Sequence, residues 1–201
     1  MTKIGFVRHG TTLWNKQGRL QGNSDVPLDE QGLREAEQAA ARLATENWDV
    51  IYASDLTRAK QTAEAVARAM GEVELHLDKR LRERYCGQIE GMTEEERIAT
   101  WGPDWRSLDL GVETKESMIE RGISFFEEVA AKHEGENILM VSHGAFLKQL
   151  LIYYIPEIDS QISLANTSVS CIVSGENGWQ LELLNCTKHL EHSKHLEQVQ
   201  K

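Results

Sequence analysis

One pattern occurs twice in this chain: a short apolar run that ends on a histidine followed by a glycine. The two copies are residues 4–10, IGFVRHG, and residues 138–144, ILMVSHG. Such runs are typical of buried strands in a parallel sheet, and open α/β sheets bind ligands just beyond the carboxyl ends of their strands. Two parallel strands would bring Arg8, His9 and His143 to one sheet edge. Either histidine alone could simply cap a strand end, but the repetition favours a site.

The size and charge of the chain restrict its class. With 201 residues, 40% of them hydrophobic and 27% charged, it is long enough for one well-buried domain, and we expect a single domain over residues 1–201. Its formal net charge of −10 argues against nucleic-acid and membrane partners. Any anion site must therefore be a local cluster of cations.

Cysteine usage and the apolar runs indicate the compartment. Cys86, Cys171 and Cys186 form an odd set without a C-x-x-C pair, which favours neither a disulfide framework nor a zinc site. No apolar run is long enough for a signal-peptide core or a membrane span. We therefore expect a reduced, cytoplasmic protein.

Hydrophobic periodicity predicts an α/β fold. Strands are expected at 4–7, 50–54, 74–77 and 138–142, and helices at 31–45, 55–70, 118–129 and 145–154. Leu33 is placed on the buried stripe of the first helix, and Asp55 is expected to cap the second. This order predicts a three-layer sandwich, with a mostly parallel central sheet flanked by helices. Alternation at 169–173 and 179–183 predicts a hairpin at the sheet edge. The irregular stretch between the strand at 74–77 and the helix at 118–129 predicts a lid-like insertion at about 84–116.

Four separated motifs follow one another along the chain. They read RHG at 8–10, SDLTRAKQTA at 54–63, LRE at 81–83 and HG at 143–144. Together they resemble the histidine phosphatase superfamily, and within it the small bacterial broad-specificity phosphatases related to phosphoglycerate mutase. The resemblance implies a phosphoglycerate mutase-like fold. It also implies a phosphoric monoester hydrolase that cleaves phosphate monoesters of small organic molecules through a phosphohistidine.

The resemblance assigns a role to five side chains. His9 would attack phosphorus, while Arg8 and Arg58 would bind phosphate oxygens with planar, permanently charged groups. His143 would stabilise charge on the transferring group, and Glu83 would protonate the leaving alkoxide and later take a proton from water. The two neighbouring arginines would keep His9 unprotonated and nucleophilic.

Further implications concern the ligand. Asn15, Gln21 and Gly144 match positions with a substrate-binding role. The implied partner is a small phosphomonoester, with no metal and no cofactor, and a homodimer is left open.

Each catalytic candidate also has a structural interpretation. Arg8 could form an ion pair with Glu83, Arg58 could decorate a helix start, and Glu83 lies beside Arg82 and Arg84 in a charged run that is usually solvated. The agreement of four motifs favours the functional interpretation.

Near the end of the chain, His189, His192 and His195 recur at helical spacing. Three histidines on one helix face could hold a metal ion. We prefer a solvated tail, since chain ends are commonly poorly ordered.

Two other functions fit the same motifs: a phosphoglycerate mutase, and a non-catalytic protein that binds phosphorylated ligands. The second is disfavoured because no catalytic residue is missing. Against the mutase, the chain lacks room for the long insertion that closes mutase sites, and residues 93–112 hold no convincing match to the arginine pair that binds glycerate. Segment 91–116 is also net acidic, which predicts a rim that repels glycerate phosphates. Apolar surface for the leaving group is expected from Tyr85, Met92, Trp101 and Trp105.

Overall fold

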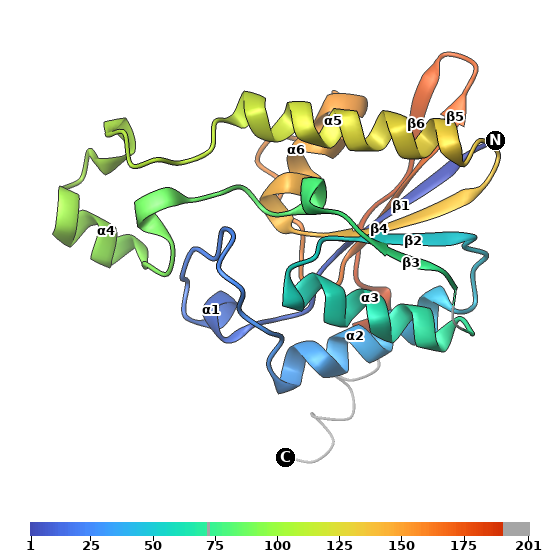
Figure 1. The fold of residues 1–201 in the computed structure, drawn as a ribbon, viewed down its shortest axis with the longest axis horizontal. Coiled ribbons are helices and arrows are strands. Elements are labelled where there is room, and N and C mark those ends of the chain that lie inside the picture. Colours follow the sequence, from blue (N-terminus) through green and yellow to red (C-terminus); the bar gives the residue numbers. More distant parts are fainter. Residues whose placement is uncertain (72, 191–201) are drawn as a thin grey trace.

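A sheet of six strands forms the centre of the structure. The computed structural model describes residues 1–71 and 73–190, and across this part of the chain the strand order is β3-β2-β4-β1-β5-β6 (Figure 1). The strands are β1 (Lys3–Arg8), β2 (Val50–Ala53), β3 (Leu75–Leu77), β4 (Asn137–Ser142), β5 (Val169–Gly175) and β6 (Gly178–Cys186). The first four pair in parallel, and β5 and β6 form an antiparallel hairpin at the edge, as predicted.

The two strands that lead into histidines are neighbours. β1 pairs with β4 in parallel, with Val7 opposite Val141 and Arg8 opposite Ser142. Both strands therefore end at the same level of the sheet. The residues that follow, His9 and His143, leave the sheet side by side, as their shared pattern predicted.

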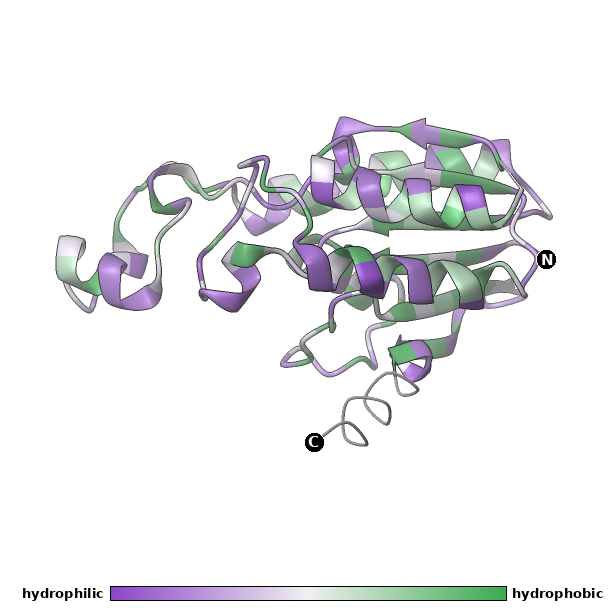
Figure 2. Ribbon diagram, turned by 90° about the horizontal axis from the view of Figure 1, so that it is seen from below, coloured by the Kyte–Doolittle hydropathy of each residue, from purple (hydrophilic) through white to green (hydrophobic). Residues whose placement is uncertain are grey.

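Helices cover both faces of the sheet (Figure 1). On one face lie α2 (Glu30–Leu43) and α3 (Thr57–Ala69), and on the other α5 (Lys115–Lys132) and α6 (Gly144–Tyr154). Strand side chains alternate between the two layers: Phe6 joins the core with α5 and α6, whereas Val7 joins the core with α2 and α3. Hydrophilic and hydrophobic residues accordingly alternate along the helices (Figure 2). The predicted three-layer sandwich is confirmed.

The start of α3 differs from the prediction. Its N-cap residue is Leu56, which makes no side-chain hydrogen bond, and Asp55 instead forms an ion pair with Arg82 at 2.6 Å. The carboxylate of Asp25 accepts a hydrogen bond from the N–H of Thr57 at 2.7 Å. The prediction was wrong because the capping carboxylate comes from a loop that is distant in sequence.

The predicted buried stripe of α2 also needs one correction. Leu33 is 46% exposed, whereas Glu35 is buried. The Glu35 carboxylate accepts a hydrogen bond from the N–H of Thr11 at 2.9 Å, just after the first histidine motif. A polar contact to the neighbouring loop therefore overrides the hydrophobic pattern at this point.

The segment at 84–116 projects from the sandwich toward α1 (Leu13–Lys16) in Figure 1. It is less irregular than expected, since it contains α4 (Glu94–Trp101), which starts with a capping box between Thr93 and Glu96. A small hydrophobic cluster holds the segment together: Cys86, Ile89, Trp105 and Leu110. This cluster is separate from the two cores that flank the sheet.

The end of the described chain packs on the body of the protein. His189 lies in the short 3₁₀ turn Lys188–Leu190, where its Nε2 is 3.2 Å from Oγ1 of Thr167 and its Nδ1 is 3.4 Å from the Arg42 guanidinium. The expected solvated tail is therefore wrong for His189, while His192 and His195 lie outside the described residues. Among residues 1–71 and 73–190, no three His, Cys, Asp or Glu side chains gather as metal ligands, and no helix is long and apolar enough to cross a membrane.

Candidate active site

His9 is fixed on all sides at the end of β1. Its backbone N–H donates to the carbonyl of Ser142 at 2.9 Å, and its own carbonyl accepts from Thr167 N at 3.3 Å and Asn166 Nδ2 at 3.0 Å. Nδ1 of the ring lies 2.7 Å from the carbonyl of Gly10. A carbonyl can only accept, so Nδ1 carries the proton and Nε2 keeps a free electron pair.

His143 lies beside His9, with ring centroids 5.2 Å apart at an interplanar angle of 60°. It is completely buried, and its Nε2 is 2.8 Å from Oγ of Ser54 at the end of β2. Its Nδ1 is buried and has no hydrogen-bond partner in the described part of the protein. Buried polar atoms are rarely left unpaired, so this nitrogen is available to a ligand.

Two arginines act on the histidines: Arg58, which is buried, and Arg8, which is partly buried. Arg58, in the first turn of α3, is fully buried and donates to the carbonyls of Ser24 and Gly22, each at 2.8 Å. Arg8 donates to the carbonyl of Leu164 at 2.5 Å. The Nε atoms of both guanidinium groups are buried and lack a partner among the described residues. Two fixed cations with free donors form a site for an anion.

The arginines and the burial determine the charge state of the histidines. Burial is the main cause that lowers the pKa of His9 well below 6.5, and the charges of Arg58 and Arg8 add to this effect. The pKa of His143 is lowered well below 6.5 for the same reasons. Burial also lowers the pKa of Arg58, to about 10, which leaves this arginine charged at neutral pH. Two neutral imidazoles thus lie within the influence of two cations.

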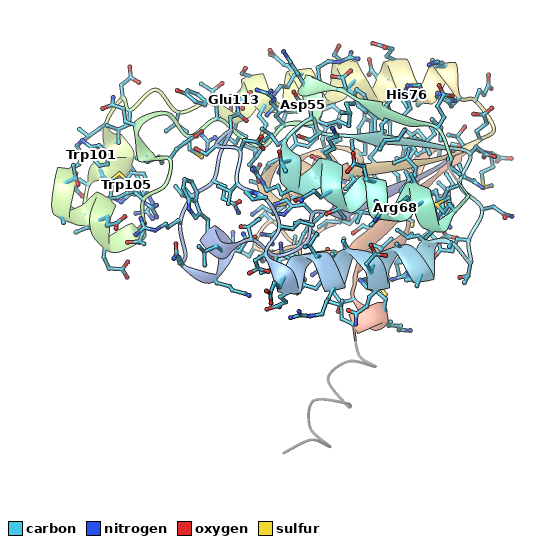
Figure 3. The ribbon with its side chains drawn as sticks, turned by 60° about the horizontal axis from the view of Figure 1, so that its bottom comes forward. Asp55, Arg68, His76, Trp101, Trp105 and Glu113 are labelled. Carbon is cyan, nitrogen blue, oxygen red and sulfur yellow. The ribbon has the colours of Figure 1, made fainter. Side chains whose placement is uncertain are left out.

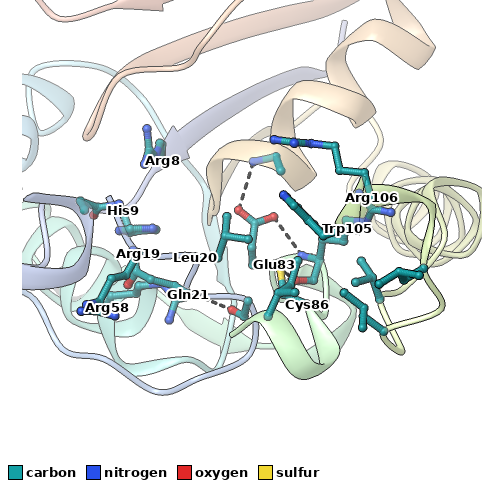
Figure 4. Close-up of a pocket in the computed structure, with 18 residues that line it drawn as sticks. Arg8, His9, Arg19, Leu20, Gln21, Arg58, Glu83, Cys86, Trp105 and Arg106 are labelled. Atoms are coloured by element: carbon teal, nitrogen blue, oxygen red, sulfur yellow. Dashed lines mark hydrogen bonds between the residues drawn. The ribbon is translucent and has the colours of Figure 1, made fainter. Parts of the chain in front are cut away.

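Glu83 lies at the amino terminus of α6, and not in a solvated charged run. Its carboxylate accepts hydrogen bonds from the N–H groups of Ala145 at 3.1 Å and Arg84 at 2.9 Å (Figure 4), and from that of Phe146 at 2.9 Å. The alternative of an ion pair with Arg8 is not seen among the ion pairs of the described residues. The helix amides hold the carboxylate at the wall of the cavity that His9 also lines (Figure 4).

These groups open into one cavity of about 530 Å³. Of the side chains with an expected role, it is lined by Arg8, His9, Asn15, Gln21, Arg58 and Glu83 (Figure 4). The side-chain oxygen of Asn15 accepts a hydrogen bond from the N–H of Thr12 at 3.1 Å, and that of Gln21 accepts one from the Thr12 hydroxyl at 3.0 Å. Both amide oxygens are thus held by the protein, and the NH₂ groups remain for a ligand.

Gly144 has a different place from the one expected. It lines a neighbouring cavity of about 310 Å³, and a Cβ atom there would lie 3.1 Å from Nε of Arg8. The small residue makes room for the arginine side chain. His143, being completely buried, lies behind the cavity wall and not on it.

The charge of the cavity wall is opposite to the acidic rim that the sequence predicted. Among the described residues that line the cavity, one is a carboxylate, Glu83, and five are arginines: Arg8, Arg19, Arg58, Arg84 and Arg106. Three acidic side chains of the segment are paired: Glu94 with Arg97 and with the cavity-lining Arg106, Glu96 with the cavity-lining Arg19, and Glu113 with Arg121. Among the described residues, Arg8, Arg58 and Arg84 form no ion pair, so these three give the wall its positive charge.

The apolar part of the wall also differs from the prediction. Trp105 lines the cavity, but Tyr85, Met92 and Trp101 do not; Trp101 packs behind Trp105 in the projecting segment (Figure 3). The remaining apolar lining comes from residues that sequence analysis did not select: Leu20, Ile89, Leu108, Leu110 and Val112. Of the residues that sequence analysis missed, Arg84 could have been placed at the cavity, because it directly follows Glu83 in the sequence.

Comparison with known proteins agrees with this geometry. The family model described as "Histidine phosphatase superfamily (branch 1)" matches residues 4–187, and the chain therefore belongs to that superfamily. It is 32% identical to the metal-independent phosphoserine phosphatase of Arabidopsis thaliana, over 94% of this chain and 84% of the relative. It is 34% identical to the probable phosphoglycerate mutase GpmB of Escherichia fergusonii, over 95% of this chain and 96% of the relative.

A solved structure shows the same fold. Bacillus stearothermophilus YhfR superposes with a TM-score of 0.85 at 28% sequence identity, over 94% of this chain and 100% of that one. The phosphoglycerate mutase-like architecture expected from the four motifs is confirmed.

Proposed function

We propose that the protein is a phosphatase that hydrolyses phosphate monoesters of small organic molecules through a phosphohistidine at His9. One observation carries this proposal: two neutral imidazoles lie 5.2 Å apart within the influence of the charges of Arg8 and Arg58, and His9 shares one cavity with both arginines and the Glu83 carboxylate. A phosphate dianion satisfies the free donors of both arginines, and phosphoryl transfer depends mainly on such positioning and charge stabilisation.

The first step transfers the phosphoryl group to the protein. Nε2 of His9 attacks phosphorus with its free electron pair, and the bond from phosphorus to the ester oxygen breaks. Glu83, as the carboxylic acid, gives its proton to the departing alkoxide, which leaves as the alcohol. Nδ1 of His9 keeps its proton because the Gly10 carbonyl accepts it at 2.7 Å.

The second step returns the histidine to its starting state. Water attacks phosphorus, the Glu83 carboxylate takes the proton of that water, and the N–P bond breaks to give inorganic phosphate and neutral His9. Arg8 and Arg58 bind the phosphate oxygens throughout, and the NH₂ groups of Asn15 and Gln21 donate to the same group.

His143 stabilises charge on the transferring group through Nδ1. For this its Nδ1 carries the proton and its Nε2 accepts from the Ser54 hydroxyl, in agreement with the 2.8 Å contact. The Gly10 carbonyl fixes the tautomer of His9, whereas the Ser54 hydroxyl, which can donate or accept, is compatible with the tautomer that this role of His143 requires. The proposal needs no metal ion, because the arginines supply the positive charge.

A phosphoglycerate mutase is the second candidate. The arginine-lined wall favours it, because the acidic rim that would repel glycerate phosphates is not present on the cavity wall. A non-catalytic binding protein is disfavoured, since His9, Glu83 and both arginines line one cavity.

One assay separates the candidates. The protein is incubated with 3-phosphoglycerate, with and without 2,3-bisphosphoglycerate, and both 2-phosphoglycerate and free phosphate are followed. We expect phosphate release from this and other monoesters, aryl esters included, without a need for bisphosphoglycerate. Efficient isomerisation with negligible phosphate release would show a mutase, and no turnover of any ester would show a binding protein.

A further inference from the structure

The loop after α1 is joined to the projecting segment 84–116 near the anion site. The N–H of Gly91 donates to the carbonyl of Leu20 at 2.8 Å, and the N–H of Leu20 donates to the carbonyl of Met92 at 3.2 Å. Arg19 adds a two-pronged ion pair to Glu96, at 2.6 and 2.9 Å. These contacts fasten the two segments together on the side of the cavity that carries Gln21.

Glu90 lies at the centre of this junction. Its Oε1 accepts hydrogen bonds from the N–H of Asn23 at 2.8 Å and from the N–H of Cys86 at 3.1 Å, and its Oε2 accepts from the Ser24 hydroxyl at 2.6 Å. One carboxylate therefore binds both segments. Hydrogen bonds to a charged acceptor are about twice as strong as neutral ones.

The loop that Glu90 holds is the loop that holds Arg58. The carbonyls of Gly22 and Ser24, on either side of the N–H bound by Glu90, accept the two terminal nitrogens of Arg58 at 2.8 Å each. The packing is tight, since a Cβ atom on Gly22 would lie 2.1 Å from Oε1 of Glu90. The charge of Glu90 also acts on Arg58 directly, by opposing the loss of positive charge on burial.

We infer that Glu90 is a positioning residue for the phosphate-binding arginine. It fixes residues 22–24, and their carbonyls fix the guanidinium of Arg58 with its Nε free for the phosphate. Glu90 itself does not line the cavity, so it acts through Arg58 and not on the substrate. This inference rests on the phosphatase function proposed above.

The alternative is that Glu90 has a structural role only, and attaches the projecting segment to the body of the protein. The two roles differ in what they do to anion binding. A purely structural contact contributes to the stability of the protein, and its loss leaves the affinity of the folded protein for phosphate unchanged. A positioning residue changes that affinity, and an acceptor of the same shape should restore it.

The test compares Glu90→Ala, Glu90→Gln and the control Asp49→Ala. Asp49 accepts a backbone N–H, that of Asn137, at 2.7 Å, at the opposite end of the sheet. Thermal unfolding, hydrolysis of p-nitrophenyl phosphate and competitive inhibition by inorganic phosphate are measured well below the unfolding temperature. For Glu90→Ala we expect kcat/KM to fall about 10- to 100-fold, the scale expected for a misplaced binding group, and the inhibition constant for phosphate to rise at least about 5-fold.

Glu90→Gln keeps an oxygen for the two N–H groups, and the Ser24 hydroxyl can turn to accept from its NH₂ group. This variant should recover activity and phosphate affinity to within about 3-fold of the wild type. Asp49→Ala should lose stability without any change in phosphate affinity. If Glu90→Ala does not fold, Ser24→Ala removes one of the three bonds and should raise the inhibition constant about 2- to 5-fold.

Two results would overturn the inference. The first is a phosphate affinity equal to that of the wild type in folded Glu90→Ala, or in Ser24→Ala if Glu90→Ala does not fold. The second is a Glu90→Gln variant that binds phosphate as poorly as Glu90→Ala. A wild-type protein that hydrolyses no ester would instead refute the proposed function. In that case phosphate binding alone, followed by calorimetry, still decides whether Glu90 positions Arg58.

Discussion

The ring of His9 is held by the carbonyl of the next residue, Gly10, at 2.7 Å, so that the nitrogen away from the backbone keeps its electron pair. The neighbouring His143 has the opposite arrangement, with its Nε2 engaged by Ser54 and its Nδ1 free. The two imidazoles thus leave different nitrogens without a partner among the described residues, Nε2 in His9 and the buried Nδ1 in His143.

His9 should become phosphorylated during turnover. Denaturing quench with a labelled ester should trap an adduct that is labile in acid and stable in alkali, because phosphoramidates hydrolyse in acid. His9→Ala should give no adduct. Label that persists in this variant would place the intermediate on another residue.

Glu83→Gln should separate esters by the quality of their leaving group. The amide can still accept a hydrogen bond from the start of α6 but has no proton to give. We expect a loss of about 10²–10⁴ in rate for alkyl esters and a much smaller loss for p-nitrophenyl phosphate, whose phenolate departs without protonation. Single-turnover rates of His9 phosphorylation measure this directly. Equal losses on both ester classes would contradict a role as proton donor.

Gly144→Ala should impair phosphate binding through Arg8. The new methyl group would meet Arg8 at 3.1–3.4 Å, which is closer than ordinary contact, so the guanidinium must shift by a few tenths of an ångström. We expect kcat/KM to fall about 10-fold with little loss of stability. Gly18→Ala serves as a control for activity alone: a methyl group there meets no atom within 4 Å, but Gly18 has a φ of +65°, so this variant loses stability for a reason of its own. Full activity in Gly144→Ala would show that Arg8 tolerates displacement.

Acid should destabilise the protein through its two buried histidines. The pKa of both is lowered in the folded state, so below about pH 6.5 the unfolded chain binds more protons than the folded one. The free energy of unfolding is therefore greatest above this pH and falls as the pH decreases, by up to about 1.4 kcal/mol per pH unit for each histidine. Urea unfolding between pH 7.5 and 5 should show a shallower slope for His143→Gln. An unchanged slope would contradict the lowered pKa.

Arg84 should favour leaving groups that carry a negative charge. Its Nε is held by the carbonyl of Glu113 at 2.6 Å, and its side chain lines the cavity beside Glu83, on the side of the departing alcohol. Arg84→Gln should lower kcat/KM for 4-carboxyphenyl phosphate about 3- to 10-fold more than for phenyl phosphate. The same loss for both esters would assign Arg84 to the phosphate and not to the leaving group.

The sequence was sufficient where short-range patterns decide the outcome. The two strand-end histidines could be placed together because parallel pairing makes strands of similar length end at one edge, and the register of β1 on β4 does so. Arg58 could be placed because helix periodicity after Val50–Ala53 assigns it to the first turn of α3.

The wall of the cavity could not be predicted in the same way. Net charge along 91–116 suggested repulsion of anions, but it does not reveal which carboxylates are already paired. Glu94 pairs with Arg97 and Arg106, and Glu96 with Arg19, so these carboxylates neutralise arginines and do not line the cavity themselves. The direction of long side chains in a segment with little regular structure depends on such pairing, which involves residues distant in sequence.

The position of β1 has a consequence for synthesis of the protein. Its two neighbours, β4 and β5, comprise residues 137–142 and 169–175, so the strand that leads into His9, the proposed nucleophile, pairs only with the second half of the chain. A nascent chain that has left the ribosome only as far as β3 holds His9 on an unpaired strand, with neither its ring neighbour nor the helix that binds Glu83. Contacts of such long range form late and slowly. We therefore expect that a chain released before β5 has been translated shows no His9-dependent hydrolysis.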